Sequence, residues 1–310
     1  MLSRLAVAII LFAQVASNPI PPRDTTPGPQ QLAWVDRSGR VIDSVGQPLQ
    51  VISDVAISSD ASRIAVRGRQ DGNDDIWVYD ASTERRTQVT TDAAAERHPA
   101  WTPAGDRLAY TSYRGSDADL LMRGPDGGGS ETTLLDGPGF QEAHAWSANG
   151  RYVIVQQRAA PSDPRIDLAY VEMNADRTLH PFVTDASAAA LPRFAPDGRH
   201  VAYMSNGSGR WEVYVKPFPD GDAIQVSKDG GAWPRWNGAG DELFFFVDDA
   251  LAVVSVSTRD TLRFGSPETL FIASHVAMNP ASLGTLDPTY DVAPDGQRFI
   301  VVQQLAGAHP

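Results

Sequence analysis

Apolar and polar residues alternate on both sides of a short turn signal, and this arrangement recurs six times along the chain. The turn position falls at intervals of 42 to 56 residues, at Asp60, Ala104, Asn149, Asp197, Ala239 and Asp295. A large apolar residue stands three positions before it, and further apolar residues stand four and six positions after it, as Phe194, Val201 and Tyr203 do around Asp197. Period-two alternation on either side of a turn predicts a β-hairpin in each copy.

The residues of the turn explain why the chain reverses there. The clearest copies read Pro-Asp-Gly at 196–198 and 294–296. Proline presets φ, aspartate can accept a hydrogen bond from its own backbone, and glycine adopts positive φ without steric cost. Ala104 and Ala239 replace the acidic residue, which weakens any ligand contact shared by all the repeats.

Each hairpin is followed by segments that predict two further strands. Third strands are expected at Ile76–Tyr79, Leu120–Met122, Leu168–Val171, Val213–Val215 and Leu251–Val254. Polar, edge-like fourth strands are expected at Thr87–Thr90, Ile224–Ser227 and Glu268–Phe271. Four strands in a repeat of about 40 to 50 residues are typical of a propeller blade. The sequence therefore predicts an all-β fold, a six-bladed β-propeller with four-stranded antiparallel blades.

The sixth copy leaves too few residues after Val301 for its two outer strands. The missing pair is expected at the other end of the chain, because Leu32–Val41 resembles the stretch Ile76–Ser82 with its following strand. We therefore expect the last blade to be closed by N- and C-terminal strands, which pairs the sheet edges at the seam of the ring. The propeller is expected to span 31–304, with a tail at 305–310.

The N-terminus has the pattern of a secretory signal peptide at residues 1–17. Arg4 precedes the apolar run Leu5–Val15, and small residues follow at a cleavage point. The run is about half as long as a membrane-spanning helix, so we expect a cleaved signal, a flexible leader at 18–30, no stable membrane insertion and a periplasmic or secreted protein. The alternatives are an uncleaved anchor or a start codon placed inside a longer gene.

Charge and cysteine content remove several function classes. The formal net charge of −12 repels the phosphate backbone of nucleic acids, so no nucleic-acid partner is expected. The absence of cysteine excludes disulfides, thiolate metal sites, cysteine nucleophiles and a lipoprotein anchor.

The repeats resemble those of a known family. The Pro-Asp-Gly turns with the downstream Ile76–Asp80 resemble the WD-like propeller repeat of TolB-type periplasmic proteins over about residues 31–304. Leu32–Gly39, Ser205–Pro219 and Tyr290–Phe299 are similar to the C-terminal propeller of bacterial membrane-bound serine/threonine protein kinases. The resemblance implies the fold and a binding or sensing role. It does not imply kinase activity, because the sequence has no Gly-rich nucleotide loop, His-Arg-Asp or Asp-Phe-Gly.

Three other functional interpretations are not favoured. Propellers of this kind also precede the catalytic domain of prolyl-oligopeptidase-type hydrolases, but the sequence lacks the Gly-x-Ser-x-Gly motif that carries their nucleophile. The segment Asp71–Asp75 resembles the start of a calcium loop, but Ile76 occupies the required glycine position and a solvated hairpin is favoured. A set of aromatic residues at equivalent blade positions is favoured as inter-blade packing over a stacking platform: Trp101, Trp146, Phe194 and Trp236.

The candidate binding residues lie on the innermost strands, where blades converge on the channel. The position just before the core residue is occupied in blade order by Ala56, Ala100, Ala145, Arg193, Arg235 and Asp291. Nearby positions add Asp54, His98, His144, Trp233 and Tyr290. Two guanidinium groups in one sector suggest a site for a carboxylate-bearing small ligand or an acidic peptide terminus. The alternative is a structural salt bridge between blades.

No cofactor or metal is expected, because His98 and His144 alone are too few ligands for a metal site. The sequence thus favours a non-catalytic propeller that binds a protein, a peptide or a small ligand. Two alternatives remain. One is a detached sensor module of a bacterial serine/threonine kinase system, and the other is a propeller enzyme, such as a lyase or lactonase, that uses the channel mouth.

Overall fold

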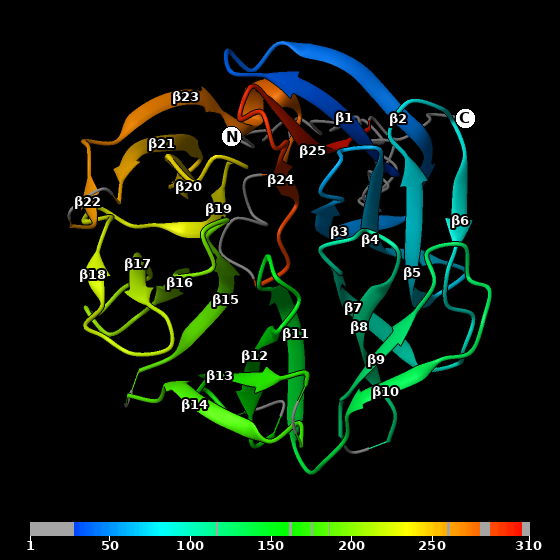
Figure 1. Cartoon of the computed structure of the whole chain (residues 1–310). Coiled ribbons are helices and arrows are strands. Elements are labelled where there is room, and N and C mark those ends of the chain that lie inside the picture. Colours follow the sequence, from blue (N-terminus) through cyan, green and yellow to red (C-terminus); the bar gives the residue numbers. More distant parts are fainter. Residues whose placement is uncertain are drawn as a thin grey trace, which may run out of the picture.

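The computed structural model describes residues 28–305 except 116, 161–162, 175, 186, 259–260 and 280–285. Within these residues the chain forms six antiparallel sheets arranged as blades around a central axis (Figure 1). The predicted all-β, six-bladed propeller is confirmed. The expected signal peptide and most of the expected leader lie outside the described residues.

Blades 1 to 3 each follow the chain from the innermost strand outward. Blade 1 contains β3 (Val51–Ile57), β4 (Arg63–Gln70), β5 (Asn73–Asp80) and β6 (Arg86–Gln88). Blade 2 contains β7 (Ala95–Trp101), β8 (Leu108–Tyr113), β9 (Asp119–Arg123) and β10 (Thr132–Leu135). Blade 3 contains β11 (Phe140–Trp146), β12 (Tyr152–Arg158), β13 (Asp167–Glu172) and β14 (Leu179–Val183).

Blade 4 has the same order, with β15 (Ala189–Phe194), β16 (His200–Ser205), β17 (Glu212–Pro217) and β18 (Ile224–Gln225). Blade 5 contains β19 (Ala232–Trp236), β20 (Glu242–Val247), β21 (Ala250–Ser257), β22 (Arg263–Phe264) and β23 (Glu268–Ile272). Both β22 and β23 pair with β21, so two short strands share the outer position. A 3₁₀ turn, η1 (Ala273–Val276), follows.

Blade 6 is assembled from both ends of the described chain. Its inner strands are β24 (Tyr290–Val292) and β25 (Arg298–Gln304), and its outer strands are β1 (Gln30–Asp36) and β2 (Val41–Leu49). β1 pairs with β25 without a register shift, from Gln30 opposite Gln304 to Asp36 opposite Arg298. Figure 1 shows blue β1 beside red β25. The predicted closing blade is confirmed, and its hydrogen bonds tie the two ends of the ring together.

The hairpin turns adopt the conformation that their sequence predicts. The residue after the turn position is left-handed in all six copies, with φ between 55° and 72°, at Ala61, Gly105, Gly150, Gly198, Gly240 and Gly296. Asp197 Oδ1 accepts the N–H of Arg199 at 2.8 Å, and Asp295 Oδ1 accepts the N–H of Gln297 at 2.9 Å. Only the first copy places a side chain, that of Ala61, where the backbone favours glycine.

The hydrophobic core lies between blades. Six clusters of buried side chains occur among the described residues, and each draws its members mainly from neighbouring blades. Trp101 of blade 2, for example, packs in one cluster with Ile76 and Val78 of blade 1. Burying one large apolar side chain stabilises the fold by about 1.5–3 kcal/mol. The apolar alternation of each blade therefore holds the ring together as well as its own sheet.

The innermost strands depart from regular pairing in a way that the sequence does not predict. In blades 1 to 5 the register against the second strand shifts by one residue, which is a β-bulge. Left-handed residues stand at the bulge in four blades: Asp54, His98, Leu191 and Trp233. A bulge redirects the side chains that follow it, and non-glycine residues in this region carry a strain of about 1–3 kcal/mol.

Candidate functional site

The innermost strands enclose a cavity of about 480 Å³ at the end of the channel where the hairpin turns lie. Residues of all six blades line it, and they include the six residues in the position just before each core residue, Ala56, Ala100, Ala145, Arg193, Arg235 and Asp291. The equivalent positions found by aligning the repeats therefore meet in one place. Three of them, all in blades 4 to 6, carry charge.

Aromatic side chains form much of the wall. Trp101, Trp146, Phe194 and Trp236 line the cavity and also belong to or pack against the clusters between blades. Trp101 Nε1 donates a hydrogen bond of 2.9 Å to the carbonyl of Ala56 in the preceding blade. Trp146 Nε1 is buried and has no hydrogen-bond partner among the described residues. These residues thus pack between blades and give the cavity an apolar surface.

Arg235 and Asp291 form an ion pair across the interface of blades 5 and 6. Arg235 Nε lies 3.0 Å from Asp291 Oδ1, and the Arg235 side chain is only 3% exposed. Asp291 also accepts the backbone N–H of Ile57 at 2.8 Å, which links it to blade 1. Arg235 Nη1 donates to the carbonyl of Pro234, whereas its buried Nη2 has no hydrogen-bond partner within the described part of the chain.

Arg193 faces the same cavity without a carboxylate partner. Its Nη1 donates to the carbonyls of His144 and Pro192, each at 2.9 Å, and it enters no ion pair with any described residue. Burial and the neighbouring positive charge of Arg235 lower the pKa of Arg193 to about 9. The guanidinium is charged at neutral pH, and a nearby negative charge would stabilise it.

His144, Asp54 and His98 lie deeper in the channel. With Arg193, they line an enclosed cavity of about 10 Å³, which is the size of one water molecule. His144 Nε2 is buried and has no hydrogen-bond partner among the described residues. His98 Nδ1 forms an ion pair with Asp54 Oδ1 at 3.4 Å. His144 lines both cavities and marks the boundary between them.

The two remaining candidates, Trp233 and Tyr290, lie in the core. Both side chains are fully buried and neither lines a cavity described above. Their rings stack with centroids 6.2 Å apart, and the Tyr290 hydroxyl donates to the carbonyl of Trp233 at 2.7 Å. These residues hold blade 5 against blade 6 and support the cavity from behind.

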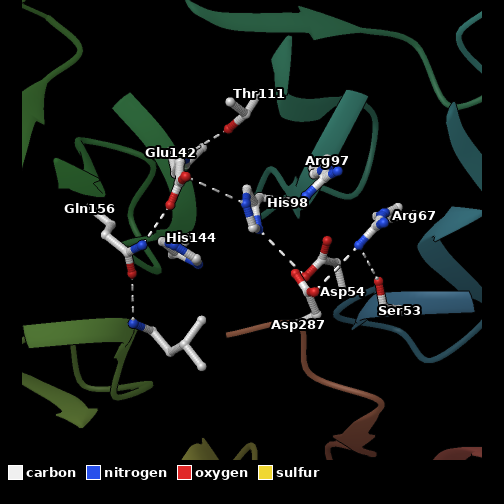
Figure 2. A network of polar contacts seen from close by, with 12 residues as sticks. Ser53, Asp54, Arg67, Arg97, His98, Thr111, Glu142, His144, Gln156 and Asp287 are labelled. Carbon is white, nitrogen blue, oxygen red and sulfur yellow. Dashed lines mark hydrogen bonds and ion pairs between the residues drawn. The ribbon is translucent and has the colours of Figure 1, made fainter. Parts of the chain in front are cut away.

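Beneath the cavity lies a network of charged side chains around Asp54 and His98 (Figure 2), and the sequence does not predict several of its members, among them Arg67, Glu142 and Asp287. Glu142 on β11 is 2% exposed and pairs with Arg158 at 2.6 Å. Arg67 on β4 pairs with Asp74 at 2.9 Å and with Asp287 at 3.5 Å. The only signal for Glu142 is a charged residue within the otherwise mainly apolar innermost strand Phe140–Trp146. Nothing in the repeat points to Arg67 or Asp287, because they come from other strands and loops.

The electrostatics of this network follow from its pairs. Burial alone would raise the pKa of Asp54, but His98, Arg67 and Arg97 outweigh it, so the pKa is lowered. Burial and the nearby Asp54 raise the pKa of Asp287.

Within the described residues, no group of three or more His, Cys, Asp or Glu side chains is arranged to hold a metal ion. Among the same residues no helix is long and apolar enough to cross a membrane.

No protein-family model matches the sequence. Among curated proteins, the chain is 24% identical over 217 residues to tricorn protease homolog 1 of Streptomyces coelicolor. The match covers 66% of this chain and 20% of that protein, so the chain spans about a fifth of the curated relative that it matches.

Solved structures show the same architecture. A putative TolB from Agrobacterium tumefaciens superposes with a TM-score of 0.69 at 15% identity, over 90% of this chain and 99% of that one. TolB from Acinetobacter baumannii gives 0.57 at 16% identity, over 78% and 64% of the two chains. An oligogalacturonate lyase in complex with manganese gives 0.51 at 13% identity, over 69% and 64%. The chain therefore has a TolB-like propeller fold, which proteins with different functions share.

Proposed function

We propose that this protein acts by binding, and that its channel mouth receives an anionic group of a ligand or of a partner protein at Arg193 and Arg235. One observation carries the proposal: the buried Nη2 of Arg235 has no hydrogen-bond partner among the described residues. A buried donor without an acceptor costs about 1–3 kcal/mol. An anion beside Arg193 would offset its charge, and a shift of the Arg235 side chain toward that anion would give Nη2 an acceptor.

The size and the fold of the site support this proposal. Cavities that bind small ligands usually measure about 300–1,000 Å³, and the mouth cavity, at about 480 Å³, lies in that range. The TolB-like fold suggests a protein-binding scaffold, so an exposed segment of a partner protein is one source of the anionic group. The proposal assigns no reaction to the channel.

Export from the cytoplasm belongs to the same proposal. The apolar run Leu5–Val15 and the small residues after it support cleavage near Asn18. The full gene would be expressed in a bacterial host, and the N-terminus of the protein recovered from the periplasm would be sequenced. Recovery of uncleaved protein in the cytoplasm would contradict export and leave the binding site unaffected.

Calorimetric titration with benzoate tests the binding site, because benzoate carries one carboxylate on an aromatic body that fits the cavity. We expect saturable binding by the wild type and at least a tenfold loss in Arg193→Ala. Arg199→Ala is the matched control, since Arg199 is exposed on the following turn of the same blade and does not line the cavity. Equal binding by wild type and Arg193→Ala, with both proteins folded, would refute the site.

A further inference from the structure

Four titratable side chains line the mouth cavity: His144, Arg193, Arg235 and Asp291. Burial, together with the positive charges of His98, Arg193 and Arg235, lowers the pKa of His144 well below its usual value, so its ring is neutral at pH 7. Two cations and one anion give the lining of the cavity a net formal charge of one positive unit, which we call the uncompensated charge.

This charge is fixed in place. Asp291 cannot turn away from Arg235, because its two oxygens accept the backbone N–H groups of Ile57 at 2.8 Å and Val292 at 2.9 Å. Arg193 is held by the two carbonyls that accept its Nη1. Preorganised charges of this kind select ligands by charge as well as by shape, because rearranging them would break several hydrogen bonds.

From this arrangement we infer that the cavity selects a ligand group with one carboxylate on an apolar body and rejects groups with two negative charges. The inference rests on the function proposed above and specifies its ligand class. One carboxylate neutralises the uncompensated charge. A second would enter a half-buried site that offers it no further uncompensated cation, because the charge of Arg235 is already balanced by Asp291, and desolvating a charge without a partner is costly.

Two further features favour the same ligand class. The aromatic wall formed by Trp101, Trp146, Phe194 and Trp236 provides apolar surface for the body of the ligand. The chain as a whole carries a formal net charge of −12, which repels an approaching dianion more strongly than a monoanion. A free aromatic or aliphatic acid has this chemistry, and so does the C-terminal carboxylate of a peptide that ends in an apolar residue.

A matched ligand series tests the inference on the full chain at pH 7.5. Benzoate, isophthalate and benzamide share one ring and carry one, two and no negative charges. We expect benzoate to bind at least tenfold more tightly than either of the others. Isophthalate binding as tightly as benzoate would overturn the inference but leave the anion site intact. Failure of both acids to bind would overturn the proposed function itself.

Peptides distinguish the two sources of the carboxylate. A hexapeptide ending in Phe with a free carboxylate would be compared with its C-terminally amidated form and with benzoate. Tighter binding of the free-carboxylate peptide than of benzoate would identify a chain terminus as the ligand, and the reverse would identify a small acid. Equal binding of the free and amidated peptides, at a Kd below that of benzoate, would contradict recognition of the carboxylate.

Asp291→Asn tests the role of charge directly, because it raises the net charge of the cavity from one to two. We expect the preference for benzoate over isophthalate to fall at least fivefold. Asp295→Asn is the control, since Asp295 lies in the same blade, is 47% exposed and does not line the cavity. Should Asp291→Asn fail to fold, Arg193→Gln serves instead: it brings the net charge to zero and is expected to abolish the preference for benzoate over benzamide. An unchanged preference in the folded variant would contradict selection by charge.

Discussion

His98 and His144 lie side by side on the innermost strands of neighbouring blades, with ring centroids 5.1 Å apart, yet their pKa values shift in opposite directions (Figure 2). Burial lowers the pKa of both. For His98 the charges of Asp54 and Glu142 outweigh burial, so its pKa is raised. For His144 the positive charge of His98 adds to burial. Protonation in the channel therefore favours His98 over His144.

These opposite shifts predict opposite effects on the pH dependence of stability. As pH falls below about 6.5, the unfolded chain protonates His144 whereas the folded chain does not, so this residue destabilises the fold in acid. The protein loses stability between pH 8 and pH 5 through this residue, and His144→Gln should reduce that loss by about 1–2 kcal/mol.

His98 contributes stability that is fully present below pH 6.5 and lost as pH rises through its raised pKa. His98→Gln should therefore destabilise the protein more at pH 5 than at pH 8. Urea unfolding at both pH values measures this, and shifts of the same sign would contradict the assignment.

Ala61 occupies a backbone conformation that favours glycine, with φ at 55°. Alanine in this region costs about 1–2 kcal/mol. Glycine avoids this cost, but its greater conformational freedom in the unfolded chain offsets about half of the stability gained. We expect Ala61→Gly to stabilise the protein by about 0.5–1 kcal/mol in thermal or urea unfolding. Gly198→Ala is the reciprocal control, because φ is 67° there and no atom lies within 4 Å of an added Cβ. It should destabilise, and a stabilising effect would contradict the conformation.

Two tryptophans of the cavity wall differ in their polar contacts. Trp101 Nε1 donates to Ala56 of the neighbouring blade, and the guanidinium of Arg63 lies 4.9 Å from its ring centroid, whereas Trp146 Nε1 has no acceptor in the described residues. Replacing each with Phe removes a similar volume. Trp101→Phe should therefore cost about 1 kcal/mol more than Trp146→Phe. Equal losses in urea unfolding would show that the polar contacts of Trp101 contribute nothing to stability.

Glu96 on β7 is fully buried. Its Oε1 accepts a hydrogen bond from the Ser112 hydroxyl at 2.9 Å, whereas its Oε2 has no hydrogen-bond partner among the described residues. Burial raises its pKa to about 7. In the unfolded chain this glutamate has a pKa of about 4.5. The stability that the protonated Glu96 contributes is therefore present in full below pH 4.5 and is lost as pH rises through 7. Glu96→Gln should thus stabilise the protein by about 2–3 kcal/mol at pH 8. At pH 4 the two proteins should be equally stable, and a gain of the same size at both pH values would exclude titration as the cause.

Much of the fold follows from local patterns. The alternation around each turn identifies the hairpins, and the residues after Asp197 and Asp295 take the left-handed conformation that glycine permits. The same alignment places Arg193 and Arg235 in equivalent positions, and both line the cavity. These properties depend on neighbours within a few residues, so the linear sequence contains them.

The arrangement of the site depends on contacts between distant residues. A one-residue bulge in the innermost strand decides which side chain faces the channel, and a period-two pattern does not specify where that bulge falls. Whether the Asp291 carboxylate pairs with a ligand or with Arg235 depends on how blade 5 packs against blade 6. The buried partners of His98 likewise come from two other blades, blades 1 and 3. The sequence by itself determined six blades, their turns and the closing strands, because backbone propensity and alternation are local. Only the tertiary structure decided which charges are paired and which are left to bind, because burial and Coulomb interactions act between side chains that the ring brings together from separate blades.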